Sequence, residues 1–131
     1  MERWLPYLLV GVGGFLGANA RYLVAKSVGN LVDARFPLGT FLINVSGSFL
    51  LGMVGGLVSE RLIPHGDHVR LALGIGFLGA FTTFSTFEYE THALFEDGVW
   101  LTALTNIFLS LFAGLLAVRA GLVLAKSWFA G

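Results

Sequence analysis

The sequence predicts an all-α integral membrane protein in which a single domain, residues 1–131, consists of four transmembrane helices. Hydrophobic residues make up 56% of the chain and charged residues only 12%, and the mean hydropathy is +0.80. Soluble domains carry about 25% charged residues. Four apolar stretches are each long enough to cross a hydrocarbon core of about 30 Å. We expect helices at about 4–26, 38–60, 69–92 and 99–126.

The first helix combines an apolar core at 4–23 with a run of small residues at 11–20. Trp4 lies near its start, where aromatic side chains anchor helices at the membrane interface. The small residues offer a surface for close helix packing. Arg21 follows near the helix end, where it either reaches the membrane surface or anchors the bundle and attracts an anion.

The second helix, with its core at 38–58, carries a polar face. The members of this face follow the spacing i, i+4, i+7 and i+8, and they are Thr40, Asn44, Gly47 and Ser48. Small and hydroxyl residues can serve packing alone. The amide of Asn44, in contrast, has two N–H donors that could bind an anion.

The third helix, with its core at 69–87, contains the most informative segment of the chain. Residues 74–88 hold three glycines, four hydroxyl residues and four phenylalanines. Backbone groups in hydrocarbon must be satisfied within the protein, so a segment this poor in helix formers is tolerated only against protein, an ion or a watery cavity. A glycine-permitted break would also free carbonyl oxygens that can coordinate a cation.

The phenylalanines of this segment are mostly three or four residues apart, so we expect them near one face: Phe77, Phe81, Phe84 and Phe87. Such a stripe alone is typical of packing or of lipid contact. Hydroxyl residues alternate with the rings, however, and lipid-facing helices have little use for them. An aromatic ring has a positive edge that can favour an anion weakly, and weak sites suit conduction.

The fourth helix has its core at 100–124 and a second polar stripe, in which Asn106 and Ser110 stand at i and i+4. Arg119 is about two turns from Lys126, so its side chain is expected to extend to the membrane surface. Arg21 and Arg119 are the two charged residues expected inside the spans. No carboxylate is expected there, because the acidic residues of the third helix, Glu88 and Glu90, are placed at its end.

The distribution of basic residues gives a weak orientation signal. One side of a four-helix bundle carries four of them, Arg3, Arg61, Arg70 and Lys126, and the other side carries two, Lys26 and Arg35. Including the deeper arginines makes this five against three. Such a small bias permits insertion in both orientations, although a single orientation with the N-terminus inside stays open. Because transport folds often use two inverted repeats, an antiparallel homodimer is the economical inference.

Composition and motifs exclude several function classes. The net charge is zero, which argues against a nucleic-acid partner. The chain has no cysteine and no nucleophile paired with a nearby base, so we expect no enzyme. The predicted location is the cell (inner or plasma) membrane, in a multi-pass arrangement within the lipid bilayer.

Four segments in order, at 13–22, 37–44, 76–87 and 106–110, resemble the Fluc/CrcB family of small fluoride channels. The resemblance covers nearly the whole chain. It implies a dual-topology, antiparallel homodimer of four-helix subunits that exports fluoride passively and relieves its toxicity. It also implies a structural sodium ion (Na⁺) at the dimer centre, held by backbone carbonyls where the third helix is broken.

The resemblance also assigns roles to individual residues. It implies that the carbonyls of Gly79 and Thr82 bind sodium, that Asn44 lines the fluoride pathway, and that Phe84 and Phe87 present ring edges to the ion. Hydroxyl residues are weaker candidates for the same pathway: Thr40, Ser85, Thr86 and Ser110. Arg21 matches a structural or vestibule charge, whereas Arg119 departs from the family pattern.

Two alternatives from other classes remain. One is a dual-topology multidrug antiporter of the small four-helix kind, which needs a membrane carboxylate to exchange protons for cations. The other is a non-conducting membrane assembly subunit in which the small and hydroxyl residues serve packing only.

Overall fold

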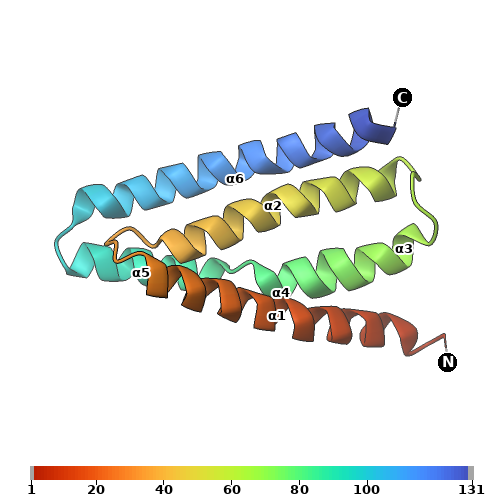
Figure 1. The fold of residues 1–131 in the computed structure, drawn as a ribbon, viewed down its shortest axis with the longest axis horizontal. Coiled ribbons are helices and arrows are strands. Elements are labelled where there is room, and N and C mark those ends of the chain that lie inside the picture. The colour runs from red at the N-terminus through yellow and green to blue at the C-terminus, as the bar shows by residue number, and fades with distance from the viewer. Residues whose placement is uncertain (1, 130–131) are drawn as a thin grey trace.

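The structure, a computed structural model, describes residues 2–129, and these residues fold into helices joined by short turns (Figure 1). The elements are α1 (Leu5–Leu31), α2 (Leu38–Ser59), α3 (Gly66–Val69), η1 (Arg70–Leu78), α4 (Gly79–Phe81), α5 (Phe84–Glu96) and α6 (Trp100–Phe129). They make four spans that are long and apolar enough to cross a membrane: Leu5–Leu31, Leu38–Ser59, Gly66–Glu96 and Trp100–Phe129. The prediction of an all-helical chain with four spans is confirmed.

Three spans extend beyond the bounds that the sequence indicates, and α6 does so by ending at Phe129 rather than at residue 126. α1 continues to Leu31 rather than ending near residue 26, so the segment expected to join the first two helices begins as helix. The third span begins at Gly66 and ends at Glu96, beyond the predicted 69–92. Hydropathy marks the part of a helix that suits hydrocarbon, whereas backbone hydrogen bonding continues past it until a residue such as Val32 adopts extended dihedrals.

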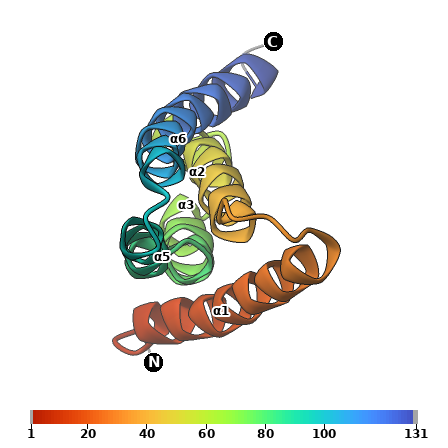
Figure 2. The same cartoon turned by 90° about the vertical axis from the view of Figure 1, so that its left-hand side faces the viewer.

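The bundle consists of two closely packed helix pairs. Figure 2 shows α6 and α2 to one side of the third span and α1 to the other. Glycines permit the close approach in both pairs: a Cβ at Gly17 of α1 would collide with the Phe77 carbonyl of η1, and one at Gly121 of α6 would collide with the Phe49 carbonyl of α2. The start of α1 and the end of α6 lie at the same end of the bundle (Figure 1).

The pairs meet in a small apolar core formed by Ile43, Leu78 and Phe81. At the far ends of α2 and α6, Glu60 and Lys126 form an ion pair of 2.9 Å. Arg119 is exposed on α6. Long apolar side chains cover much of the outer surface, as suits contact with lipid or with a second membrane subunit.

The third span changes its backbone geometry along its length. η1 is a π-helical stretch, which is wider than an α-helix. After the single turn of α4, Thr82 and Thr83 are extended, with φ and ψ of −78° and 159° and of −150° and 122°. α5 then restarts at Phe84. These two extended residues face α2 and determine where the polar groups of the third span point.

Candidate functional site

The side chain of Asn44 holds the interruption in the third span. Its Nδ2 donates to the Thr83 carbonyl oxygen at 3.0 Å, and its Oδ1 accepts from the Thr83 N–H at 2.8 Å. A side-chain amide carries a donor and an acceptor side by side, so it can donate to and accept from the same residue in this way. A polar residue of α2 therefore satisfies backbone groups that the extended geometry leaves without helical partners.

Two donors are diverted from their usual helical acceptors. In a continuous helix the Thr83 N–H would bond to the Gly79 carbonyl, four residues back, but it bonds to Asn44 instead. The Thr86 N–H would bond to the Thr82 carbonyl, but it bonds to Thr83 Oγ1 at 3.3 Å, as at a helix N-cap. The carbonyls of Gly79 and Thr82 thus lose their regular donors at the same interruption.

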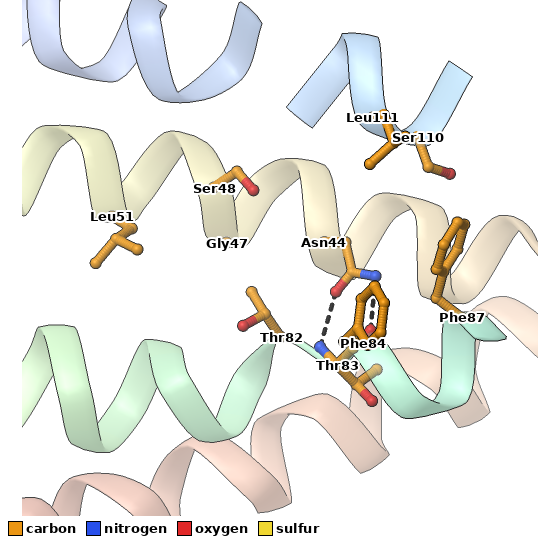
Figure 3. A pocket seen from close by; sticks show the side chains of 10 residues that line it. All are labelled: Asn44, Gly47, Ser48, Leu51, Thr82, Thr83, Phe84, Phe87, Ser110 and Leu111. Carbon is orange, nitrogen blue, oxygen red and sulfur yellow. Dashed lines mark hydrogen bonds between the residues drawn. The ribbon is translucent and has the colours of Figure 1, made fainter. Parts of the chain in front are cut away.

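A cavity of about 250 Å³ opens beside this interruption, between α2, α5 and α6. Figure 3 shows Asn44 reaching from α2 to Thr83, with the side chains of α6 on another wall. The lining residues are Asn44, Gly47, Ser48, Leu51, Thr82, Thr83, Phe84, Phe87, Ser110 and Leu111. None of these ten described residues carries a formal charge. The cavity therefore offers amide and hydroxyl groups and aromatic rings to a ligand.

The two cavity phenylalanines differ in their surroundings. Phe87 is buried, with 8% of its surface exposed, whereas Phe84 is 72% exposed. Their ring centroids lie 6.1 Å apart, with the planes tilted by 44°. The expected stripe of four rings on one face is wrong, because the extended residues separate this pair from Phe77 and Phe81, which stack on each other at 5.9 Å.

A second cavity, of about 200 Å³, collects other residues singled out in the sequence. Arg21, Thr40, Thr86 and Glu90 line it together with Thr83, which also lines the first cavity. Apart from Ser85 and Asn106, the polar residues that the sequence singles out near the interruption therefore line one of two cavities, one with a cationic and an acidic side chain and one without charge. Ser85 is exposed and lines neither of these two.

Glu90 corrects the expectation that the spans hold no carboxylate. It lies in the middle of α5, where the Thr40 hydroxyl donates to its Oε1 at 2.8 Å. Its other oxygen, Oε2, is buried without a hydrogen-bond partner among residues 2–129. The sequence places Glu90 at a helix end because the apolar run stops near Phe87, but α5 continues and directs Glu90 toward α2.

A third polar group lies between α5 and α6. Asn106 is 1% exposed, and its Nδ2 donates to Thr91 Oγ1 at 2.8 Å. Ser110, one turn along α6, donates to Asn106 Oδ1 at 3.1 Å. The sequence predicts a polar stripe at Asn106 and Ser110 but does not indicate Thr91. The signal available was its i+4 spacing from Phe87, whose carbonyl Thr91 contacts.

Four membrane-length spans, the third of them interrupted and with uncharged polar groups gathered at the interruption, define a small multi-pass membrane protein of the transport class. A family model described as CrcB-like protein, Camphor Resistance (CrcB), matches residues 8–122. The chain belongs to this family. The resemblance identified from the sequence and the multi-pass location in the cell membrane are thereby confirmed.

Relatives with assigned names agree with the family match. A protein of Solibacter usitatus named fluoride-specific ion channel FluC is 46% identical over 93% of this chain and 99% of its own length. A FluC of Prosthecochloris aestuarii is 43% identical over 97% of this chain and 98% of its own. One from Moorella thermoacetica, named fluoride-specific ion channel FluC 2, is 45% identical over 95% of this chain and its full length.

Proposed function

We propose that this chain forms a fluoride-selective channel that exports fluoride passively across the cell membrane and relieves its toxicity. Relatives named as fluoride-specific ion channels align with it over nearly its whole length. The same relatives confirm the prediction that the chain is not an enzyme. The observation that carries the proposal is the uncharged polar cavity beside the Asn44–Thr83 hydrogen bonds.

The chemistry of this cavity fits a small, strongly hydrated anion. Such an ion enters only where close donors replace its water. Asn44 uses one Nδ2 hydrogen on Thr83 and keeps the second, and Phe84 and Phe87 add the positive edges of their rings. Fixed dipoles without a formal charge hold an anion loosely enough for it to leave. The weaker pathway candidates are Thr40, Ser85, Thr86 and Ser110, with Arg21 as a vestibule charge.

We also propose a structural sodium ion at the carbonyls of Gly79 and Thr82. These two carbonyls fit such a group, because the donors that would normally occupy them are diverted to Asn44 and to the Thr83 side chain. Hard cations prefer oxygen ligands. One chain offers two of these oxygens, and an inverted second copy would bring the total to four. The bound ion would supply a fixed positive charge between the two subunits.

The antiparallel, dual-topology homodimer belongs to the same proposal. The basic residues give a bias of only four against two, which permits insertion in both orientations. Phe84 is mostly exposed in a single subunit although it lies beside the polar cavity, as expected of a residue that a partner subunit covers. The proposed functional break at Thr82 and Thr83 would then meet its inverted copy at the centre of the dimer.

Glu90 is the one observation that favours the antiporter alternative, because it places a carboxylate inside the third span. Thr40 already holds one of its oxygens, however, and the relatives bear the names of channels. The other alternative, a non-conducting assembly subunit, would not require the second Asn44 hydrogen or the uncharged cavity.

Fluoride efflux from liposomes tests the proposal. Purified protein is reconstituted with sodium present, and a fluoride electrode follows release after a potassium ionophore allows charge to balance. A channel releases fluoride only once the ionophore is added, and it does not need a pH gradient. Release that follows the pH gradient without ionophore would support proton coupling, and no release at all would refute the channel.

A further inference from the structure

A network of hydrogen-bonded polar groups connects the cavity to the backbone of α5. Ser110 Oγ lies 3.1 Å from Asn106 Oδ1, and Asn106 Nδ2 lies 2.8 Å from Thr91 Oγ1. Thr91 Oγ1 in turn lies 2.7 Å from the carbonyl oxygen of Phe87. Asn106 and Thr91 are 1% and 6% exposed, so these bonds are formed away from solvent. Of the three side chains in this network, only Ser110 also lines the cavity.

The carbonyl oxygen of Phe87 determines which group donates and which accepts in every hydrogen bond of this network. A carbonyl oxygen only accepts, so the Thr91 hydroxyl donates its single hydrogen there. Its oxygen is then an acceptor for the NH₂ group of Asn106, which turns the Asn106 amide oxygen toward Ser110. An amide oxygen carries no hydrogen, so Ser110 donates to it. The single Ser110 hydrogen therefore points at Asn106 and is withheld from the cavity.

We propose that Asn106 is a positioning residue that competes with the permeating anion for the hydrogen of Ser110. This inference rests on the proposed function. An anion in the cavity needs a donor, and Ser110 supplies one only by releasing Asn106. The Asn106 oxygen is then left buried without a donor, which is costly. The competition weakens anion binding and favours release, as conduction requires.

The substitution Asn106→Leu removes the competing acceptor at similar side-chain volume and leaves the Thr91 bond to Phe87 in place. The Ser110 hydrogen is then free for the anion. We expect the fluoride concentration that gives half-maximal efflux to fall about 3- to 10-fold, the effect of one net hydrogen bond, while the maximal rate decreases. A purely structural role for Asn106 would lower the rate without tightening the half-saturation value.

The double variant Asn106→Leu/Ser110→Ala tests whether the effect of Asn106 acts through the Ser110 hydroxyl. Ser110→Ala removes the hydrogen for which Asn106 competes, so adding Asn106→Leu to it should leave half-saturation unchanged. Persistence of the shift in the Ser110→Ala background would overturn the proposal, as would a half-saturation value in Asn106→Leu that is equal to or above that of the wild type.

A matched pair at Thr91 gives the same test with less change to the helix interface. Valine resembles threonine in shape but lacks the hydroxyl, so in Thr91→Val the Asn106 amide can turn its NH₂ group to Ser110 and release the serine hydrogen. Half-saturation should fall again, and Thr91→Ser, which keeps the hydroxyl, should restore the wild-type value. If Asn106→Leu does not fold, the two Thr91 variants still test the proposal. Equal half-saturation values for Thr91→Val and Thr91→Ser would overturn it. Wild-type protein that releases no fluoride would refute the proposed function itself, and the inference with it.

Discussion

The side-chain amide of Asn44 forms both main-chain hydrogen bonds of Thr83, 39 residues away, at 3.0 and 2.8 Å. The third span can therefore leave helical geometry in a membrane without unpaired backbone groups at Thr83. One residue thus serves two roles: it completes the backbone of the interruption, and it lines the cavity. Substitutions at Asn44 should affect stability and flux together.

We expect Asn44→Asp to abolish fluoride efflux and to lower stability by about 1–3 kcal/mol, the cost of a buried unpaired group. A carboxylate has no N–H for the Thr83 carbonyl and places a negative charge in an anion pathway. Efflux assays and thermal unfolding measure the two effects. Asn30→Asp is the matched control, since Asn30 is exposed near the end of α1, away from the cavity and from the apolar part of the span. Wild-type flux in Asn44→Asp would remove Asn44 from the pathway.

Gly17→Ala should destabilise the bundle by about 1–3 kcal/mol, the usual cost of overpacking. The added methyl group would overlap the Phe77 backbone carbonyl, which cannot rotate away as a side chain can. Gly11→Ala, in the same helix, is the control, because a Cβ there meets no atom within 4 Å. Denaturation in detergent compares the two. Equal stability would show that α1 and η1 separate easily.

Much of this fold follows from composition, because membrane-length apolar runs determine the four spans and their order. The interruption itself is suggested by the glycines and hydroxyls of residues 74–88. What local sequence does not contain is the partner of each polar group. Asn44 is conspicuous as an amide within an apolar helix, but its pairing with Thr83 depends on how α2 lies against the third span. Glu90 is likewise assigned to a helix end until the length of α5 shows it facing Thr40.

Replacing the cavity phenylalanines should separate packing from conduction. We expect Phe84→Ile and Phe87→Ile both to lower efflux, because each removes a ring edge from the cavity. Only Phe87→Ile should also reduce the stability of the subunit, by about 1 kcal/mol, since Phe87 is buried and Phe84 is 72% exposed. Efflux and unfolding are measured on the same preparations. Unchanged flux in both variants would make the rings packing residues.

Removal of sodium tests the proposed cation site. In buffer where an organic cation replaces sodium at equal ionic strength, we expect the melting temperature to fall by about 5 °C and efflux to slow. The carbonyl oxygens of Gly79 and Thr82 lack their usual helical donors, and without sodium they also lack the proposed cation. Returning sodium should restore both properties. Identical melting curves and flux without sodium would argue against a structural ion.

The proposed dual topology can be tested directly, because the chain contains no cysteine. A single cysteine introduced by Asp97→Cys lies in the exposed turn between α5 and α6, and one introduced by His65→Cys lies at the opposite end of the bundle. With the weak bias of basic residues, a membrane-impermeant maleimide should label about half of the protein at either position in intact cells. Adding Lys or Arg residues at one end alone should shift this fraction strongly, since the existing difference is only four against two. Labelling at one position and complete protection at the other would show a single orientation, and the antiparallel dimer could not form.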